Sequence, residues 1–233
     1  MATEIQPEAH FFDADDTLEN RQFLARLWQV LRVYFGGAKM LDKLLIEYSS
    51  EEDIPQYSPG SSEDSDLKLH WKDLSKPLKL PGKISELASK YFHSTRTVVP
   101  GVIGLLQQLS EMNMPINLVT GRRNHKSWIE MTEKNFMQNG IGTFFQEKFF
   151  TPKGTKSALN KAIVVKDQLK KYQTVNFYED DVETAVFLAW IFEERIKVHL
   201  IYHSINKPLY AKLQIRDFPN IELLNVTEKY AKS

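Results

Sequence analysis

Three aspartates follow a short apolar run near the N-terminus, where residues 10–18 read HFFDADDTL. The apolar run predicts a buried strand, and Asp13 and Asp15 come where that strand ends and the chain turns. Both carboxylates can therefore face one crevice, since the crevices of open α/β sheets lie at the carboxyl ends of the strands. Two carboxylates this close repel unless a proton or a cation lies between them, and a divalent cation that prefers oxygen ligands would satisfy both.

Two other structures could explain an Asp-X-Asp pair at a strand end. A simple turn or helix cap is the more common one. An EF-hand calcium loop is the other, but Leu18 stands at its sixth position, where that loop needs glycine, and Leu24 at its twelfth, where it needs glutamate. The EF-hand is therefore excluded, whereas the choice between a turn and a site depends on the rest of the chain.

Two further apolar runs end in polar residues. One reads INLVTGR and carries Thr120 at its end, and the other reads VNFYEDD and ends in Glu179, Asp180 and Asp181. Both predict strands buried on both faces, because their cores are almost purely apolar. A threonine at a strand end says little alone, but here it accompanies acids at two other strand ends.

The elements that would position these residues alternate between short apolar runs and helical patterns. This alternation is typical of an α/β fold, in which helices cover a parallel sheet. The expected strands lie at 9–13, 116–120, 147–150, 174–178, 197–202 and 221–226, and the expected helices at 102–111, 125–139, 155–171 and 182–194. Pro100 and Gly101 would open the first of these helices, and Asn139 and Gly140 would close the second.

The region from residue 19 to residue 97 interrupts the alternation. Apolar residues at helical spacing between Phe23 and Phe35 predict one helix, and we expect two more at 38–48 and 83–93. Residues 49–66 hold six acids, six serines, two prolines and no basic residue, which is typical of a solvated, mobile loop. The chain thus divides into a core, 1–18 and 98–233, and a helical insertion, 19–97.

Composition narrows the classes of function. The 30 basic and 30 acidic residues balance, so a nucleic-acid partner would have to rely on a local patch. There is no cysteine, which excludes thiol nucleophiles, disulfides and cysteine-bound zinc. The N-terminus lacks the basic and apolar regions of a secretory signal, and no apolar stretch is long enough to span a bilayer. We expect a soluble, cytoplasmic protein without a membrane partner.

The run HFFDADDTL resembles the first motif of the haloacid dehalogenase (HAD) superfamily, an apolar strand followed by Asp-X-Asp-X-Thr-Leu. Asp16 stands where the family usually has glycine. The resemblance implies that Asp13 is a nucleophile that is transiently phosphorylated. It also implies that Asp15 protonates the leaving group and later activates water. Family members with a second aspartate are usually phosphatases or phosphotransferases, which argues against dehalogenase chemistry.

INLVTGR is similar to the second motif of the family. The resemblance implies that the hydroxyl of Thr120 contacts the transferring phosphoryl group, with Gly121 and Arg122 beside it at the substrate. Arg122 and Arg123 could reach other anionic groups of a substrate, although an exposed basic helix start explains them equally well.

FYEDD resembles the family motif that completes a magnesium site. It implies that Mg²⁺ is held by Asp13, the main-chain carbonyl of Asp15, and Asp180, with Asp181 as the next candidate. Glu179 replaces the usual glycine, which leaves the second acidic ligand open, and Glu179 could instead orient a ligand or touch the substrate.

The family also carries a lysine near the start of the helix before this strand, where it balances the carboxylates and the phosphoryl oxygens. TPKGTKSAL offers Lys153 and Lys156, and we favour Lys156 because it would lie in the first helical turn. The remaining lysines fit better as the solvated face of that helix: Lys161, Lys166, Lys170 and Lys171.

The resemblance covers the core from Asp13 to Asp181 and implies a Rossmann-like three-layer sheet with a C1-type helical cap. The implied function is magnesium-dependent hydrolysis of a small phosphorylated metabolite through an aspartyl-phosphate. A phosphotransferase, a phosphatase acting on polynucleotide ends and a non-catalytic binding domain remain alternatives. A weaker similarity to the RNA-repair branch of the family keeps the polynucleotide alternative open, although the neutral composition does not favour it.

Overall fold

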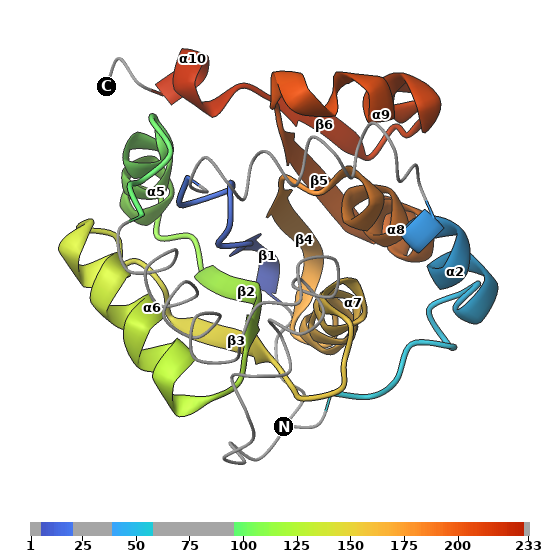
Figure 1. Cartoon of the computed structure of the whole chain (residues 1–233), viewed down its shortest axis with the longest axis horizontal. Helices are drawn as coiled ribbons and strands as arrows, with labels where there is room; N and C mark the ends of the chain where they lie inside the picture. The colour runs from blue at the N-terminus through green and yellow to red at the C-terminus, as the bar shows by residue number, and fades with distance from the viewer. Residues whose placement is uncertain (1–5, 21–38, 58–95, 231–233) are drawn as a thin grey trace, which may run out of the picture.

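The computed structural model describes residues 6–20, 39–57 and 96–230 of the chain (Figure 1). In these ranges the chain forms a six-stranded parallel sheet with the order β3-β2-β1-β4-β5-β6. The strands are β1 (Gln6–Phe12), β2 (Ile116–Arg123), β3 (Glu147–Thr151), β4 (Tyr172–Glu179), β5 (Ile196–Ile201) and β6 (Ile221–Leu224). The six strands expected from the sequence are confirmed, and the fold is the predicted Rossmann-like α/β sheet.

Helices cover both faces of the sheet, so that the core has three layers (Figure 1). The first face carries α7 (Ser157–Gln168), α8 (Val182–Phe192) and α9 (Lys207–Lys212), and the second carries α5 (Val102–Glu111), α6 (Lys126–Gln138) and α10 (Val226–Tyr230). Short 3-10 turns η2 (Glu193–Arg195), η3 (Ser204–Asn206) and η4 (Ile215–Asp217) complete the connections. The four core helices expected from the sequence are confirmed; α5 has the expected bounds, and α6, α7 and α8 are slightly shorter than expected.

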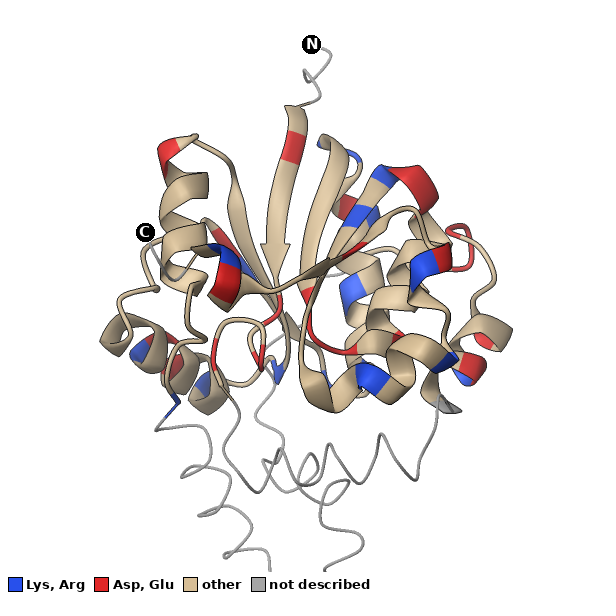
Figure 2. Ribbon diagram, turned by 90° about the horizontal axis from the view of Figure 1, so that it is seen from above, with Lys and Arg blue, Asp and Glu red and all other residues tan. Residues whose placement is uncertain are grey.

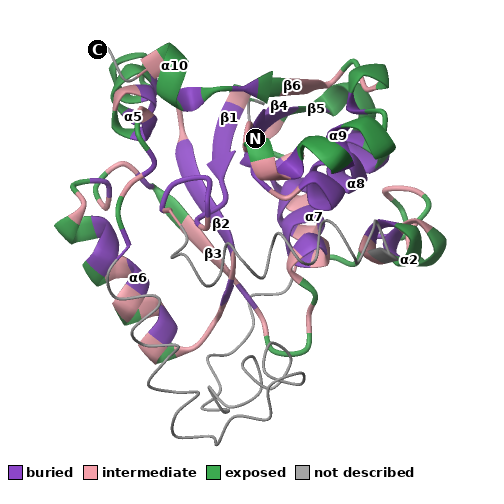
Figure 3. Ribbon diagram, turned by 45° about the horizontal axis from the view of Figure 1, so that its top comes forward, coloured by how far each residue is buried: buried purple, intermediate pink, exposed green. Residues whose placement is uncertain are grey.

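The side chains of β1 alternate between the two faces of the sheet, so this strand contributes to both hydrophobic cores. Ala9 and Phe11 pack into the core under α7 and α8, whereas Phe12 packs into the core under α5 and α6. Successive side chains of a strand point to opposite faces, so an apolar run such as AHFF can fill both layers. Figure 3 shows the result, with buried residues along the central strands and on the inner sides of α7 and α8.

Part of the insertion is joined firmly to the core. Helix α2 (Lys39–Glu47), close to the helix expected at 38–48, places Leu41 and Leu44 in the core beside α8. The buried Glu183 of α8 accepts hydrogen bonds from the main-chain N–H groups of Met40 and Leu41, at 3.1 and 3.2 Å. A carboxylate at this end of a helix satisfies N–H groups that have no partner within the helix.

The expected mobile loop at 49–66 needs correction in its first part. Residues 49–57 fold onto α7, with the side chain of Ile54 only 1% exposed. The ammonium group of Lys166 donates to the carbonyls of Glu51 and Ile54, each at 2.7 Å, and Asp53 accepts from the main chain of Ser49 and Ser50. Residues 58–66, and the helices expected at 23–35 and 83–93, lie outside the described residues, so the cap stays a prediction.

The order of the strands places a crevice at the centre of the sheet. The chain leaves β1 for β2 and β3 on one side and returns to β4 and β5 on the other, which makes the β1–β4 junction a topological switch point. Ligands of such sheets bind beyond the carboxyl ends of the strands at this point. Figure 2 shows acidic residues in the loops that follow the central strands there.

Among the described residues, no helix has both the length and the apolar character needed to cross a bilayer.

Candidate active site

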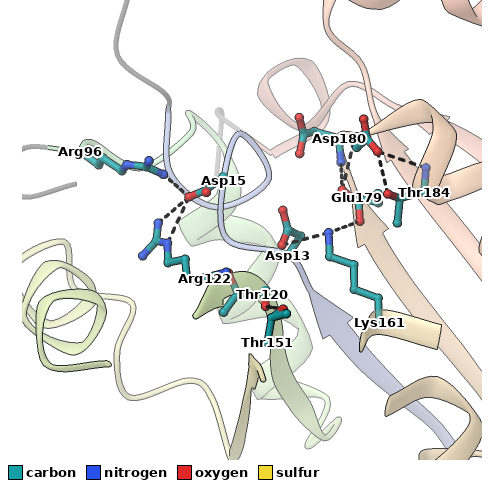
Figure 4. A network of polar contacts seen from close by, with 11 residues as sticks. Asp13, Asp15, Arg96, Thr120, Arg122, Thr151, Lys161, Glu179, Asp180 and Thr184 are labelled. Atoms are coloured by element: carbon teal, nitrogen blue, oxygen red, sulfur yellow. Dashed lines mark hydrogen bonds and ion pairs between the residues drawn. The ribbon is translucent and has the colours of Figure 1, made fainter. Parts of the chain in front are cut away.

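Three buried carboxylates meet at the β1–β4 junction. Asp13 follows β1, its N–H donates to the Tyr178 carbonyl at 3.0 Å, and Glu179 and Asp180 stand at the end of β4. One oxygen from each of Asp13, Glu179 and Asp180 lies within 4.8 Å of the others, and all three residues are at most 5% exposed (Figure 4). The structure thus brings Asp13 and Asp180 together, and their role as metal ligands stays a prediction.

Lys161 of α7 supplies the cation of this carboxylate cluster. Its ammonium nitrogen lies 3.1 Å from Asp13 Oδ1 and 2.6 Å from Glu179 Oε2 (Figure 4). Burial alone would lower the pKa of Lys161, but the charges of Asp13 and Glu179 outweigh it and raise that pKa above its usual value. Lys161 therefore stays charged and draws Asp13 toward the end of β4.

The structure corrects the choice of lysine. Lys156 is half-exposed and its ammonium group lies 2.8 Å from Glu47 of α2, whereas Lys161, which we had assigned to the solvated face of α7, is only 3% exposed. A signal for Lys161 was present in the sequence, because it shares a helical stripe with Ala158, Ala162 and Val165, all buried. A lysine inside an apolar stripe is buried with it and needs a carboxylate partner.

Glu179 organises the turn after β4. One of its oxygens accepts hydrogen bonds from the N–H groups of Asp180 and Asp181, at 3.1 and 3.0 Å, and the other accepts from Lys161. Burial raises the pKa of Glu179 to about 7, although Lys161 opposes this shift. This residue, whose role the sequence left open, thus belongs to the carboxylate cluster and orients Lys161.

Asp181 has a different place from the one expected for a metal ligand. Its carboxylate caps α8, where it accepts from the N–H and the hydroxyl of Thr184 at 3.2 and 2.6 Å. The set of described carboxylates that could hold a metal contains Glu179 instead of Asp181. An aspartate just before a helix satisfies the free N–H groups of the first turn, and that role explains the second acid of FYEDD.

Thr120 and Gly121 lie at the end of β2, next to β1. Thr120 is fully buried, and its hydroxyl oxygen accepts from the Arg122 N–H at 3.2 Å, so its own O–H can donate to a ligand. A side chain at Gly121 would come within 2.5 Å of the Ser157 hydroxyl, so glycine lets β2 approach the first turn of α7 closely. Both residues lie on β2, the neighbour of β1, and their contact with a substrate stays a prediction.

Arg122 is buried rather than directed at an open substrate site. Its guanidinium donates to Asp15 Oδ1 at 2.7 Å, to Glu19 Oε2 at 2.6 Å and to the Thr132 hydroxyl at 3.0 Å. Arg96 also contacts Asp15 Oδ1 (Figure 4). Asp15 therefore differs from Asp13 in its surroundings, because arginines surround it where carboxylates surround Asp13. Arg123 donates to the carbonyls of Pro152 and Thr155, at 3.0 and 2.9 Å.

The loop between Asp15 and Thr17 explains why the family motif favours glycine here. Asp16 has a φ of 58°, in the left-handed region that glycine adopts most easily and aspartate tolerates. Its N–H donates to the Glu19 carbonyl at 2.7 Å, and its own carbonyl lies 3.0 Å from His203 Nε2. The replacement of glycine by Asp16 therefore keeps the turn that brings Asp15 back over the sheet.

The carboxylate cluster fits a hard divalent cation. Asp13, Glu179 and Asp180 offer oxygen ligands, and Lys161 supplies a single positive charge to the three of them. Because Glu179 already accepts from Lys161 and two N–H groups, Asp13 and Asp180 are the better placed of the three to hold a metal.

A doubly wound parallel sheet with a carboxylate cluster at its switch point defines an α/β protein with an acidic crevice. Comparison with solved structures supports this fold. The chain is similar to a putative β-phosphoglucomutase from Thermotoga maritima, with a TM-score of 0.55, 17% identity and 95% of each chain covered. It is also similar to the L-2-haloacid dehalogenase of Xanthobacter autotrophicus with chloropropionic acid covalently bound, with a TM-score of 0.53, 12% identity, and 90% of this chain and 83% of that chain covered. No family model and no curated protein sequence matches the chain.

Proposed function

We propose that this protein is a magnesium-dependent phosphomonoester hydrolase that acts through an aspartyl-phosphate on Asp13. The observation that carries the proposal is the carboxylate cluster, in which Asp13 lies 3.1 Å from Lys161 and within 4.8 Å of an oxygen of Asp180, with a second aspartate, Asp15, two residues further on. A dehalogenase that forms an ester on one aspartate has no need of the second acid or of a cation site.

In the proposed reaction, an oxygen of Asp13 forms a bond to phosphorus while the bond from phosphorus to the ester oxygen breaks. Asp15 gives a proton to the departing oxygen. In the second step Asp15 takes a proton from water, whose oxygen attacks phosphorus, so that inorganic phosphate leaves and Asp13 is regenerated.

The other residues of the crevice would stabilise charge and position the substrate. Lys161 holds Asp13 in a fixed direction, and the Thr120 hydroxyl can donate to a phosphoryl oxygen. When bound by Asp13 and Asp180, a magnesium ion would neutralise the charge of the phosphoryl oxygens. The 2.6 Å contact with Glu179 keeps the Lys161 ammonium at the carboxylates rather than in solvent.

We further propose that the substrate is a small phosphorylated metabolite in the cytoplasm. The chain has 30 acidic and 30 basic residues, so it lacks the overall positive charge that favours polynucleotide binding. A phosphatase for polynucleotide ends is the second candidate, since Arg123 follows the second motif.

The deciding experiment measures phosphate release from sugar phosphates, nucleotides, phospholipid head groups and end-phosphorylated oligonucleotides, and chloride release from 2-chloropropionate. Each assay is run with Mg²⁺ and after exhaustive metal removal. We expect phosphate release that needs Mg²⁺ and no chloride release. Metal-independent chloride release would replace the proposal with dehalogenase chemistry. Efficient, steeply salt-dependent release from oligonucleotides would favour the second candidate.

A further inference from the structure

A buried ion-pair cluster surrounds Asp15 and connects it to both ends of the insertion. The cluster consists of Asp15, Glu19, Arg96 and Arg122, and we call it the arginine cluster. The side chains of Glu19, Arg96 and Arg122 are 0%, 4% and 2% exposed, whereas that of Asp15 is 24% exposed. Asp15 is therefore the member of the cluster that opens to solvent, as a proton donor at the crevice must.

Arg122 is fixed at several points and forms the rigid side of the arginine cluster. It contacts Asp15, Glu19 and the Thr132 hydroxyl of α6, and its guanidinium lies 5.7 Å from the centre of the Phe136 ring. Burial opposes the charge of Arg122, but the two carboxylates outweigh it and raise its pKa. Asp15 thus always faces a guanidinium on the α6 side.

Arg96 approaches the same Asp15 oxygen from the chain that returns from the insertion. There the two ends of the insertion run side by side, since the Asn20 N–H donates to the Thr97 carbonyl at 2.8 Å and Glu19 bridges to Val98. The Asn139 amide joins them, donating to the Arg96 carbonyl at 3.0 Å and to Glu19 Oε1 at 3.3 Å. The main chain of Arg96 is therefore anchored to the core.

We propose that Arg96 is a positioning residue that sets the direction of Asp15 for proton transfer. The proposal rests on the proposed phosphatase function. Arg122 and Arg96 both contact Oδ1 of Asp15, from two sides. Two contacts fix the direction of a carboxylate that a single contact would leave free to rotate. A guanidinium suits this task better than an ammonium, because its planar donors define a direction as well as a charge.

The test compares Arg96→Gln and Arg96→Lys with wild type on two substrates, 4-nitrophenyl phosphate and an alkyl phosphate such as ethyl phosphate. Nitrophenolate leaves without help, whereas an alkoxide needs the proton from Asp15. We expect Arg96→Gln to lower kcat/KM for ethyl phosphate by roughly 10²-fold, within the range of general acid catalysis, and for 4-nitrophenyl phosphate by less than about tenfold. Arg96→Lys should recover part of the loss.

Arg195→Gln is the matched control. Arg195 precedes β5, at the edge of the sheet opposite the crevice, and forms an ion pair with Glu51, so its loss should leave both rates unchanged. Equal losses on both substrates, with a parallel fall in thermal stability, would show that Arg96 only holds the fold and would overturn the proposal. Unchanged rates in Arg96→Gln would overturn it too, while leaving the phosphatase function standing. If the wild type neither hydrolyses these esters nor becomes phosphorylated by acetyl phosphate, the proposed function fails and this inference fails with it.

Discussion

Asp13 and Asp15 are two residues apart in the chain, but they lie in opposite electrostatic surroundings. Asp13 shares its cluster with two other carboxylates and one lysine, so negative charge is in excess there. Asp15 and Glu19 face two arginines, so there is no excess of negative charge there. A bound cation would therefore offset the negative charge of the carboxylate cluster, whereas the arginine cluster already contains its own positive charges.

This difference follows from the elements that surround each residue. Asp13 stands beside the acidic end of β4, whereas the turn at Asp16 brings Asp15 back toward β2 and the end of the insertion. Groups that do different chemistry need different surroundings, and one short turn provides both here. Removing one member of a cluster at a time tests whether the two sets of surroundings have these separate roles.

The largest effect should come from Asp13→Asn. The amide is nearly the same size as the carboxylate but is a far weaker nucleophile, so turnover should fall by roughly 10⁴-fold or more while the fold is kept. Phosphate release and circular dichroism check the two parts of this prediction. Asp167→Asn, at an ion pair on the outer end of α7, is the control and should keep full activity. Near wild-type turnover in Asp13→Asn would show that Asp13 is not the nucleophile.

The second effect concerns stability and separates the two clusters directly. Lys161→Met and Arg122→Met each leave buried carboxylates without their cation, which should cost about 3–5 kcal/mol of unfolding free energy. Mg²⁺ should restore part of the loss in Lys161→Met, because it binds the folded carboxylate cluster, and none of the loss in Arg122→Met.

Urea unfolding of both variants with and without about 10 mM Mg²⁺ measures this difference, because an excess of a ligand over its Kd stabilises the folded state that binds it. Equal rescue of the two variants would show that Mg²⁺ binds elsewhere, and would contradict the contrast between the clusters.

The third effect compares the two lysines of the α7 region. Lys161→Met should lower kcat by roughly 10²–10³-fold, the loss seen when one preorganised charge is removed from an active site. Lys156→Met should change kcat little, because Lys156 is half-exposed and paired with Glu47. Steady-state kinetics at saturating Mg²⁺ makes the comparison. A larger loss for Lys156→Met would return the charge-balancing role to the first turn of α7.

These contrasts also show what the sequence could reveal. The strands and the acids at their ends were predictable, because buried parallel strands are apolar runs and their ends share one edge of the sheet. Lys161 was missed because general rules place lysines on solvated faces, and only the partners from β1 and β4 make its burial favourable.

The folding of residues 49–57 was hidden for a similar reason. Their composition is that of a loop, but Ile54 packs in the core, and the Lys166 ammonium group donates hydrogen bonds to two of their carbonyls. Composition reports the average preference of a segment, whereas these contacts depend on a helix more than a hundred residues away in the chain. The arginine cluster likewise joins residues from three separate segments.

The smallest effect should come from a third polar group, which lies away from both clusters. The ring of His199, on β5, stacks on the ring of Tyr178 with 4.5 Å between the ring centres, and its Nε2 lies 3.1 Å from the Asn176 amide oxygen. Burial lowers the pKa of His199 to about 4, even though the Glu222 carboxylate 3.4 Å away opposes the shift. Lys161 and Arg122 have more or closer carboxylates and higher ordinary pKa values than a histidine, so both keep their charge.

The pH dependence of stability tests whether folded His199 stays neutral where Lys161 and Arg122 stay charged. In the unfolded chain a histidine binds a proton below about pH 6.5, whereas folded His199 stays neutral down to about pH 4. The unfolded state therefore binds more protons between these values, so the free energy of unfolding should fall as the pH drops through this window. Linkage gives a loss of about 2 kcal/mol from His199 between about pH 7.5 and pH 5. Urea unfolding at both pH values should show a smaller loss in His199→Gln than in wild type. An identical loss in both proteins would mean that Glu222 keeps His199 charged in the fold, as the carboxylates keep Lys161 charged.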